Sequence, residues 1–111
     1  PSSVLGLRGM SGVAAYAPAK AGIVQLTKQP AIEWARYGIR VNAICPGYFP
    51  TEAEEFQREG AIEQMASRVP MRRLGELSEL DGPFLLLASP ASSYMTGSVL
   101  SVDGGLANNG V

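Results

Sequence analysis

Two short apolar segments, separated by helical patterns, place the strongest constraint on the fold of this chain. Residues 39–45 are rich in β-branched residues and stop at Pro46-Gly47, as a buried strand would. Residues 98–102 form a second apolar strand before Asp103-Gly104-Gly105. Strands that alternate with helices indicate a parallel sheet in an α/β fold. Two strands alone make no stable sheet, so we expect further strands upstream or in another molecule.

A long helix is predicted over residues 15–37, with Gly38 as the residue that ends it. Its first turns are small and apolar on nearly every side, which predicts burial against the sheet on one face and a second subunit on another. Pro18 is expected in the first turn, where proline is tolerated. Pro30 lies in the interior, where a proline costs about 3 kcal/mol. We therefore expect a kink near Thr27 or a weakened helix.

Two further helices are predicted in the second half of the chain. A capping box opens a polar helix over residues 51–68, which Gly60 weakens in the middle. A second capping signature opens a helix over residues 78–88, whose first turns Pro83 should distort. Residues 1–13 are rich in Gly and Ser and are expected to form a loop that leaves an upstream strand.

The composition excludes several classes of function. The chain has 111 residues, 46% hydrophobic and 17% charged, with a net charge of −1, which is typical of one soluble globular unit and not of a nucleic-acid-binding protein. Its longest strongly apolar run, residues 84–88, is far too short to span a membrane, and no secretory signal is expected. A cytoplasmic setting fits this pattern.

The absence of histidine and the single cysteine limit the chemistry further. Without histidine, a Ser-His-Asp or Cys-His arrangement is impossible within this chain. One cysteine makes no intrachain disulfide and no structural zinc site of the usual Cys/His type, so no metal site is expected. Cys45 lies in the apolar strand and is expected to be a buried, inert thiol.

Tyr16 and Lys20 stand four residues apart, and Ser3 precedes Tyr16 by thirteen residues. On a helix, Tyr16 and Lys20 would share one face. The pKa of a free phenol is about 10, and a neighbouring cation favours the phenolate and lowers that pKa toward neutral pH. Such a pair is suited to proton transfer. The alternative is a packed tyrosine beside a solvated lysine.

The sequence resembles the C-terminal half of a short-chain dehydrogenase/reductase over essentially its whole length. Ser3, Tyr16 and Lys20 match the Ser, Tyr and Lys of that family in type and spacing. Further segments match in the same order, namely Gly38–Ala43, Pro46–Thr51, Arg73–Glu76, Leu86–Ser89, Tyr94–Gly97 and Val102–Gly105. The resemblance implies that residues 1–111 are a partial domain, the C-terminal part of a Rossmann-like doubly wound parallel sheet.

The resemblance also implies an activity, the transfer of hydride between NAD or NADP and a small secondary alcohol or carbonyl substrate. Tyr16 would be the general acid/base and would contact both substrate and cofactor. Lys20 would lower the pKa of the phenol and bind the nicotinamide ribose hydroxyls. Ser3 would donate a hydrogen bond to the substrate oxygen, although Ser2 is a near neighbour and an ordinary loop serine is the alternative.

Cofactor and substrate contacts are implied for the segment after the second strand. Pro46, Gly47, Phe49 and Thr51 would hold the nicotinamide, with the backbone of Phe49 and the hydroxyl of Thr51 gripping its carboxamide. Thr51 could instead, or in addition, cap the following helix. Residues 52–76 would form a mobile lid over the substrate, and Tyr48 would contact the substrate.

The chain also departs from the family pattern. The glycine-rich cofactor turn, the residue that selects NAD or NADP and an upstream asparagine have no counterpart, so we expect a piece of a longer chain that is inactive and marginally stable alone. The parent protein is expected to be a homo-oligomer, a dimer or tetramer. A non-catalytic truncated product or subunit-assembly module is the alternative. A hydrolase that uses Tyr16, or Ser3 with Lys20, is a remote third possibility.

Overall fold

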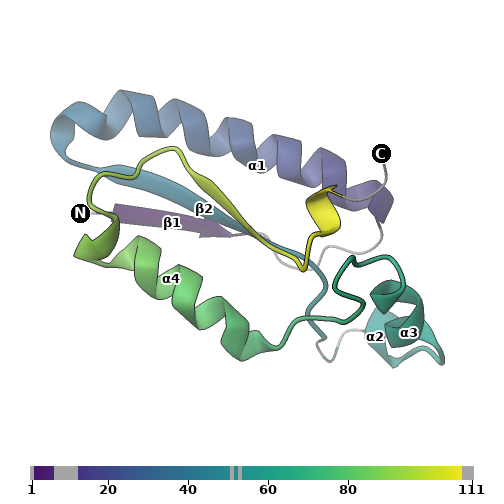
Figure 1. The fold of residues 1–111 in the computed structure, drawn as a ribbon. Coiled ribbons are helices and arrows are strands. Elements are labelled where there is room, and N and C mark those ends of the chain that lie inside the picture. Colours follow the sequence, from purple (N-terminus) through teal and green to yellow (C-terminus); the bar gives the residue numbers. More distant parts are fainter. Residues whose placement is uncertain (1, 7–12, 51, 53, 109–111) are drawn as a thin grey trace.

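The protein folds as a three-stranded parallel sheet with a helix on each face (Figure 1). The computed structural model describes residues 2–6, 13–50, 52 and 54–108, with the backbone alone for residues 2–6, 13–17, 55 and 108. The strands are β1 (Ser2–Gly6), β2 (Arg40–Pro46) and β3 (Val99–Val102), in the spatial order β1-β2-β3. The predicted α/β fold with a parallel sheet is confirmed.

The helices are α1 (Val13–Trp34), α2 (Glu54–Gln57), α3 (Ala61–Ala66) and α4 (Asp81–Ala88). Four short 3₁₀ segments, η1 (Ala35–Tyr37), η2 (Leu77–Leu80), η3 (Pro90–Ser92) and η4 (Leu106–Asn108), join or follow them. Helix α1 lies along one face of the sheet and α4 along the other, while α2 and α3 gather beyond one end of it (Figure 1). This arrangement is a partial doubly wound layer.

The prediction of a loop over residues 1–13 is wrong for residues 2–6, which form β1. This strand pairs in parallel with β2, with Ser3 opposite Val41. The pairing partner lies almost forty residues away along the chain, so local composition does not reveal it. As a result β2 is the central strand, and all five residues from Val41 to Cys45 are buried.

Helix α1 begins two residues earlier than predicted, so the expectation that Pro18 lies in the first turn is wrong. Because the helix starts at Val13, Pro18 lies beyond the first turn and removes a backbone hydrogen bond there. The helix continues through Pro30 to Trp34 without interruption (Figure 1). The hydroxyl of Thr27, which is fully buried, donates to the carbonyl oxygen of Ile23 at 2.6 Å.

The predicted end of this helix is confirmed. Gly38 has a φ of 75°, in the left-handed region that glycine adopts at little cost. Its N–H donates to the carbonyl oxygen of Ala35 at 3.0 Å, and the N–H of Ile39 donates to that of Trp34 at 3.3 Å. These two hydrogen bonds are the Schellman arrangement, which satisfies the last carbonyl groups of a helix.

Burial of α1 on every side is not seen in the described chain. Its inner face, with Ile23, Thr27 and Ala31, is buried against the sheet. On the outer face Leu26 and Ile32 each keep 67% of their surface exposed.

The single helix predicted over residues 51–68 is divided into α2 and α3. Gly60, between them, has a φ of 76°, which breaks the helical backbone.

The capping position before α4 is also corrected. The N–H of Glu76 donates to the Glu79 carboxylate at 2.9 Å, so the cap forms two residues before Ser78. Pro83 is the third residue of α4 and follows the tight 3₁₀ turn η2.

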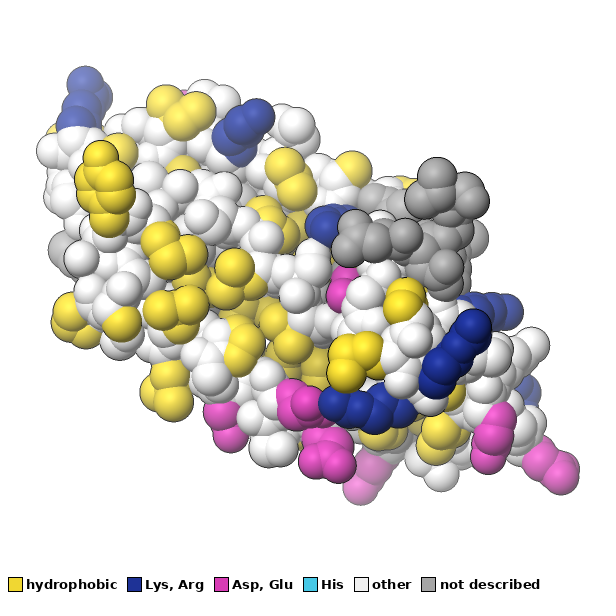
Figure 2. Space-filling view, viewed as in Figure 1, with side chains coloured by type: hydrophobic (Ala, Val, Ile, Leu, Met, Phe, Trp, Pro, Cys, Tyr) yellow, Lys and Arg dark blue, Asp and Glu magenta, His cyan; other side chains and the backbone are white. Residues whose placement is uncertain are grey.

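The core lies between α1, the sheet and the α2–α3 pair. Its buried members are Ile23, Ala43, Cys45, Tyr48, Phe56, Ala61, Met65, Val69 and Leu106. The predicted burial of Cys45 is confirmed. Apolar side chains spread over the part of the surface above α4 and β3, while charged ones gather over α2, α3 and the turn before α4 (Figure 2). Within the described residues, no helix is both long and apolar enough to cross a membrane.

Candidate active site

The candidate site lies at the edge of the sheet where the parallel strands end. Gly6 of β1 pairs with Ile44 of β2, and Pro46 of β2 pairs with Val102 of β3, so the three carboxyl ends share one edge. The start of α1, the α2–α3 pair and η4 all lie at this end (Figure 1). In doubly wound sheets, ligands bind outside the carboxyl ends of the strands.

Of the three predicted catalytic residues, Tyr16 and Lys20 lie near the start of α1, beside this edge, whereas Ser3 pairs with Val41 toward the amino ends of the strands. Ser3 lies within β1, Tyr16 lies in the first turn of α1, and Lys20 follows one turn later. The side chains of Ser3 and Tyr16 lie outside the described residues. Lys20 is half-buried, and no hydrogen bond or ion pair to its ammonium group occurs in the part of the chain that the structure describes.

The segment after β2, which we call the Pro-Gly loop (residues 46–50), is anchored at both ends. The N–H of Gly47 donates to the carbonyl oxygen of Val102 at 2.9 Å. The carbonyl oxygen of Tyr48 accepts from the N–H of Gly75, also at 2.9 Å. Across residues 2–6, 13–50, 52 and 54–108, no hydrogen bond to the N–H or the C=O of Phe49 is present, although Phe49 is only 9% exposed. Thr51 lies outside the described residues.

Asp103 supports this loop from the end of β3. Its two carboxylate oxygens accept from the N–H groups of Gly105 at 2.9 Å and Ala107 at 3.0 Å, which orders the chain into η4. A side chain at Gly47 would overlap Asp103, because a Cβ there would lie 2.7 Å from the Asp103 Cβ. The close approach of these two segments therefore requires glycine at position 47.

Tyr48 is buried, with 4% of its surface exposed, and its hydroxyl oxygen has no hydrogen-bond partner among the described residues. The ring belongs to the same apolar cluster as Phe56, Ala61 and Met65 from α2 and α3. A buried hydroxyl without a partner costs about 1–3 kcal/mol.

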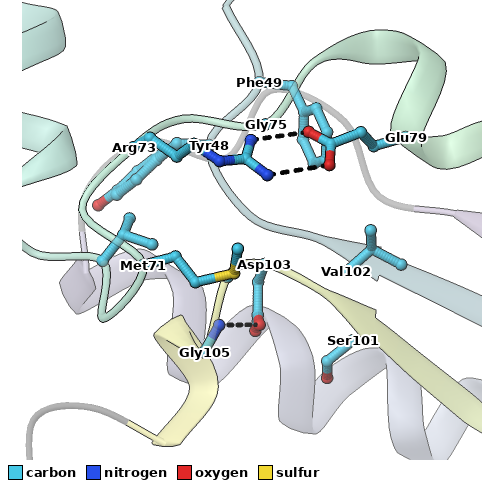
Figure 3. Close-up of a pocket in the computed structure, with 12 residues that line it drawn as sticks. Tyr48, Phe49, Met71, Arg73, Gly75, Glu79, Ser101, Val102, Asp103 and Gly105 are labelled. Carbon is cyan, nitrogen blue, oxygen red and sulfur yellow. Dashed lines mark hydrogen bonds and ion pairs between the residues drawn. The ribbon is translucent and has the colours of Figure 1, made fainter.

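A cavity of about 360 Å³ opens beside the Pro-Gly loop (Figure 3). Its walls are Tyr48, Phe49, Val69, Met71, Arg73, Gly75, Glu79, Ser101, Val102, Asp103, Gly104 and Gly105. The phenol of Tyr48 points away from the Arg73–Glu79 pair that closes one side of the cavity (Figure 3).

Arg73 and Glu79 form a two-pronged ion pair in the segment that we call the Arg-Gly turn (residues 73–80). The guanidinium donates to the two carboxylate oxygens at 2.8 and 3.0 Å. Hydrogen bonds from Arg73 and from the N–H of Glu76 stabilise the carboxylate and lower the pKa of Glu79 to about 2. The hydrogen bond to Glu79 correspondingly raises the pKa of Arg73.

The Arg73–Glu79 ion pair and the contact of Gly75 with the ring of Phe49 were not predicted from the sequence. Arg73 to Glu76 stood out only as one matching family segment, and Glu79 only as part of a capping signature. The six-residue separation of Arg73 and Glu79 follows no helical or strand period, and no local pattern indicates that Gly75 meets Phe49. Among the described residues, no cluster of side chains suited to hold a metal ion is present.

Taken together, a parallel α/β layer, with the Pro-Gly loop and the start of α1 at the carboxyl edge of its strands, defines a Rossmann-like protein. A family model described as enoyl-(acyl carrier protein) reductase matches residues 1–107. The chain belongs to the short-chain dehydrogenase/reductase family.

Individual relatives agree with this assignment. The chain is 46% identical over 105 residues to the 3-oxoacyl-(acyl-carrier-protein) reductase FabG of Thermotoga maritima, an alignment that covers 95% of this chain and 43% of the relative. It is 44% identical over 105 residues to nodulation protein G of Azospirillum brasilense, with the same two coverages of 95% and 43%. The chain thus spans less than half the length of these relatives.

A solved structure is similar over the same extent. The gluconate 5-dehydrogenase of Burkholderia cenocepacia, in complex with NADP and tartrate, superposes with a TM-score of 0.78 at 35% sequence identity. The match covers 96% of this chain and 44% of that one. The predicted C-terminal part of a Rossmann-like sheet is therefore confirmed.

Proposed function

We propose that this chain carries the acid/base half of an NAD(P)-dependent oxidoreductase, with Tyr16 as its general acid/base. The observation that supports the proposal is that Tyr16 and Lys20 lie on successive turns near the start of α1, next to the carboxyl edge of the sheet. The substrate class is a secondary alcohol or the corresponding carbonyl compound. Relatives named as a reductase and a dehydrogenase support this class of reaction.

Each catalytic side chain has a physical role in this proposal. Tyr16 gives a proton to the carbonyl oxygen during reduction, or takes one from the alcohol during oxidation. The Lys20 cation favours the phenolate and so brings the phenol into a useful range for proton transfer. Ser3 donates a hydrogen bond to the oxygen on which negative charge develops. A bound nicotinamide supplies or accepts the hydride.

The residues present fit a nicotinamide cofactor. The ammonium group of Lys20 is suited to bind ribose hydroxyls, and the N–H and C=O of Phe49 are suited to bind a carboxamide, which both donates and accepts; none of these groups has a hydrogen-bond partner among the described residues. Pro46, Gly47 and Thr51 belong to the same proposed contact region. The NADP held by the Burkholderia relative supports the assignment of NAD or NADP.

We also propose that residues 52–76 act as a lid over the substrate. The break at Gly60 leaves α2 and α3 as two short helices, so in this proposal α2 and α3 move while residues 73–76 stay in place against the Pro-Gly loop. Opening of this lid would expose the Tyr48 hydroxyl, now buried without a partner, to a polar group of the substrate.

The test is Tyr16→Phe in the full-length protein, assayed by oxidation of NADH and NADPH with a panel of ketones. We expect turnover to fall by at least about a hundredfold, the usual contribution of a general acid/base. Binding of the dinucleotide should change little, because the phenyl ring preserves the shape. Tyr37→Phe, at an exposed position in η1, is the matched control and should leave turnover unchanged.

Undiminished turnover in Tyr16→Phe would contradict the assigned role of Tyr16. If the wild-type full-length protein bound neither dinucleotide, the oxidoreductase proposal would fail. That result would favour a non-catalytic product or subunit-assembly module of the same family.

A further inference from the structure

We propose that Gly75 is a positioning residue for nicotinamide binding. Because Gly75 has no side chain, the ring of Phe49 packs directly against its Cα, and this contact holds the backbone of the Pro-Gly loop in place. This inference rests on the proposed function, in which the backbone of Phe49 binds the nicotinamide carboxamide. Gly75 itself touches neither substrate nor cofactor in this proposal.

The fit between Gly75 and Phe49 leaves no room for a side chain. A Cβ built on Gly75 would lie 2.6 Å from Cζ and 2.8 Å from Cδ2 of the Phe49 ring, and would also meet Cε2. Real Cβ atoms essentially never approach a carbon this closely. Gly75 is not among the residues with positive φ, so its backbone conformation is open to any L-residue. Glycine is therefore needed here for the ring contact and not for its backbone freedom.

A hydrogen bond reinforces the ring contact. The N–H of Gly75 donates to the carbonyl oxygen of Tyr48 at 2.9 Å, directly before Phe49 in the chain. Gly75 thus holds two successive residues of the Pro-Gly loop, one through its backbone and one through its missing side chain. Displacement of the ring would shift the very peptide groups that are proposed to bind the carboxamide.

The Arg-Gly turn gives Gly75 a rigid base. On one side of Gly75, Arg73 is held by both carboxylate oxygens of Glu79. On the other side, the N–H of Glu76 donates to the same carboxylate at 2.9 Å. Because Arg73 and Glu76, on the two sides of Gly75, are both tied to Glu79, the turn cannot readily move away from a ring that is pushed against it. Strain from an added side chain would therefore pass to the Pro-Gly loop.

The experiment compares two ligands in the full-length protein. NADPH and NADH carry the nicotinamide, whereas ADP-ribose and its 2′-phosphate lack it. In Gly75→Ala we expect the dissociation constant of the better-bound dinucleotide to rise about tenfold, as is usual when a packed contact is overfilled. The dissociation constant of the matching ADP-ribose should stay within about twofold, since those contacts lie outside the Pro-Gly loop.

Two further variants separate the ring contact from general effects. Gly82→Ala, in α4, is the matched control, because nothing lies within 4 Å of a Cβ at that position, and it should change neither constant. Phe49→Leu removes the ring edge, so adding Gly75→Ala to Phe49→Leu should weaken dinucleotide binding less than it does in the wild type. If Gly75→Ala alone fails to fold, the double variant should fold.

The outcomes distinguish this inference from the proposed function. Unchanged dinucleotide binding in Gly75→Ala, with normal binding by the wild type, would overturn the positioning role alone. Equal weakening of both ligands, or a double variant that also fails to fold, would likewise overturn it. No dinucleotide binding by the wild type would overturn the proposed function and this inference together.

Discussion

At the scale of one residue, Tyr48 buries its hydroxyl group in an apolar core. Its ring packs with Phe56 and Met65, yet its hydroxyl finds no partner there. Burial of an unsatisfied hydroxyl opposes folding, whereas burial of the ring favours it. The residue therefore contributes less to stability than phenylalanine would at the same place.

We predict that Tyr48→Phe raises the free energy of unfolding by about 1 kcal/mol, because it removes the unsatisfied hydroxyl and keeps the ring. Urea unfolding followed by circular dichroism measures the change. Tyr94→Phe is the control, since Tyr94 is fully exposed and should leave stability unchanged. A loss of stability in Tyr48→Phe would mean that the hydroxyl has a bonding partner after all.

At the scale of an element, the Arg-Gly turn is held by charge and not by apolar burial. Arg73 and Glu79 are both exposed, and two hydrogen bonds join their side chains. A third hydrogen bond, from the N–H of Glu76, ties the start of η2 to the same carboxylate. Such a turn depends on the ionised state of one residue.

The ionised Glu79 makes the stability of this element depend on pH. Its pKa is lowered from 4.5 to about 2 in the folded protein, so its contribution is fully present above about pH 4.5 and is lost as the pH falls toward 2. We predict that Glu79→Gln lowers the free energy of unfolding near neutral pH and that this difference disappears in strong acid.

Glu59→Gln is the matched control for this pH profile. Glu59 is exposed and makes no ion pair in the described chain, so its substitution should leave a small difference that changes little with pH. Added salt should also reduce the effect of Glu79→Gln, because exposed ion pairs are screened. A difference that persisted unchanged in strong acid would contradict the assigned role of the ion pair.

At the scale of the whole molecule, the described chain leaves large apolar side chains exposed to solvent, above all on α4. On α4, Phe84, Leu85 and Leu86 are 44%, 69% and 37% exposed. Apolar side chains spread over this part of the surface (Figure 2). The sheet has β1 at one edge and β3 at the other, and strand edges are ready templates for association. Surface of this kind favours contacts with other chains.

We predict that the 111-residue chain on its own associates with itself at micromolar concentration and that Leu85→Lys reduces this association. Light scattering over a dilution series measures the mean mass. Gln25→Lys is the control, because it adds the same charge at an exposed position of α1 without removing apolar surface. A wild-type chain that stays monomeric at high concentration would contradict the prediction.

Local patterns in the residues were enough to predict much of this protein. They indicated the parallel α/β order, the end of the helical segment α1–η1 at Gly38 and the end of β2 at Pro46-Gly47, and all three are confirmed. They also placed Tyr16 and Lys20 on one helix. Periodicity and helix-ending residues act within a few positions of one another, which is why the sequence reveals them.

Contacts between distant segments were decided by the tertiary structure. Residues 2–6 become a strand because β2, far along the chain, supplies their hydrogen bonds. Gly75 meets the ring of Phe49, and Tyr48 packs in one cluster with side chains of α2 and α3, because the Pro-Gly loop, the Arg-Gly turn and these two helices converge at one end of the sheet. No local pattern encodes such meetings, since they depend on how the elements pack and not on what each prefers alone.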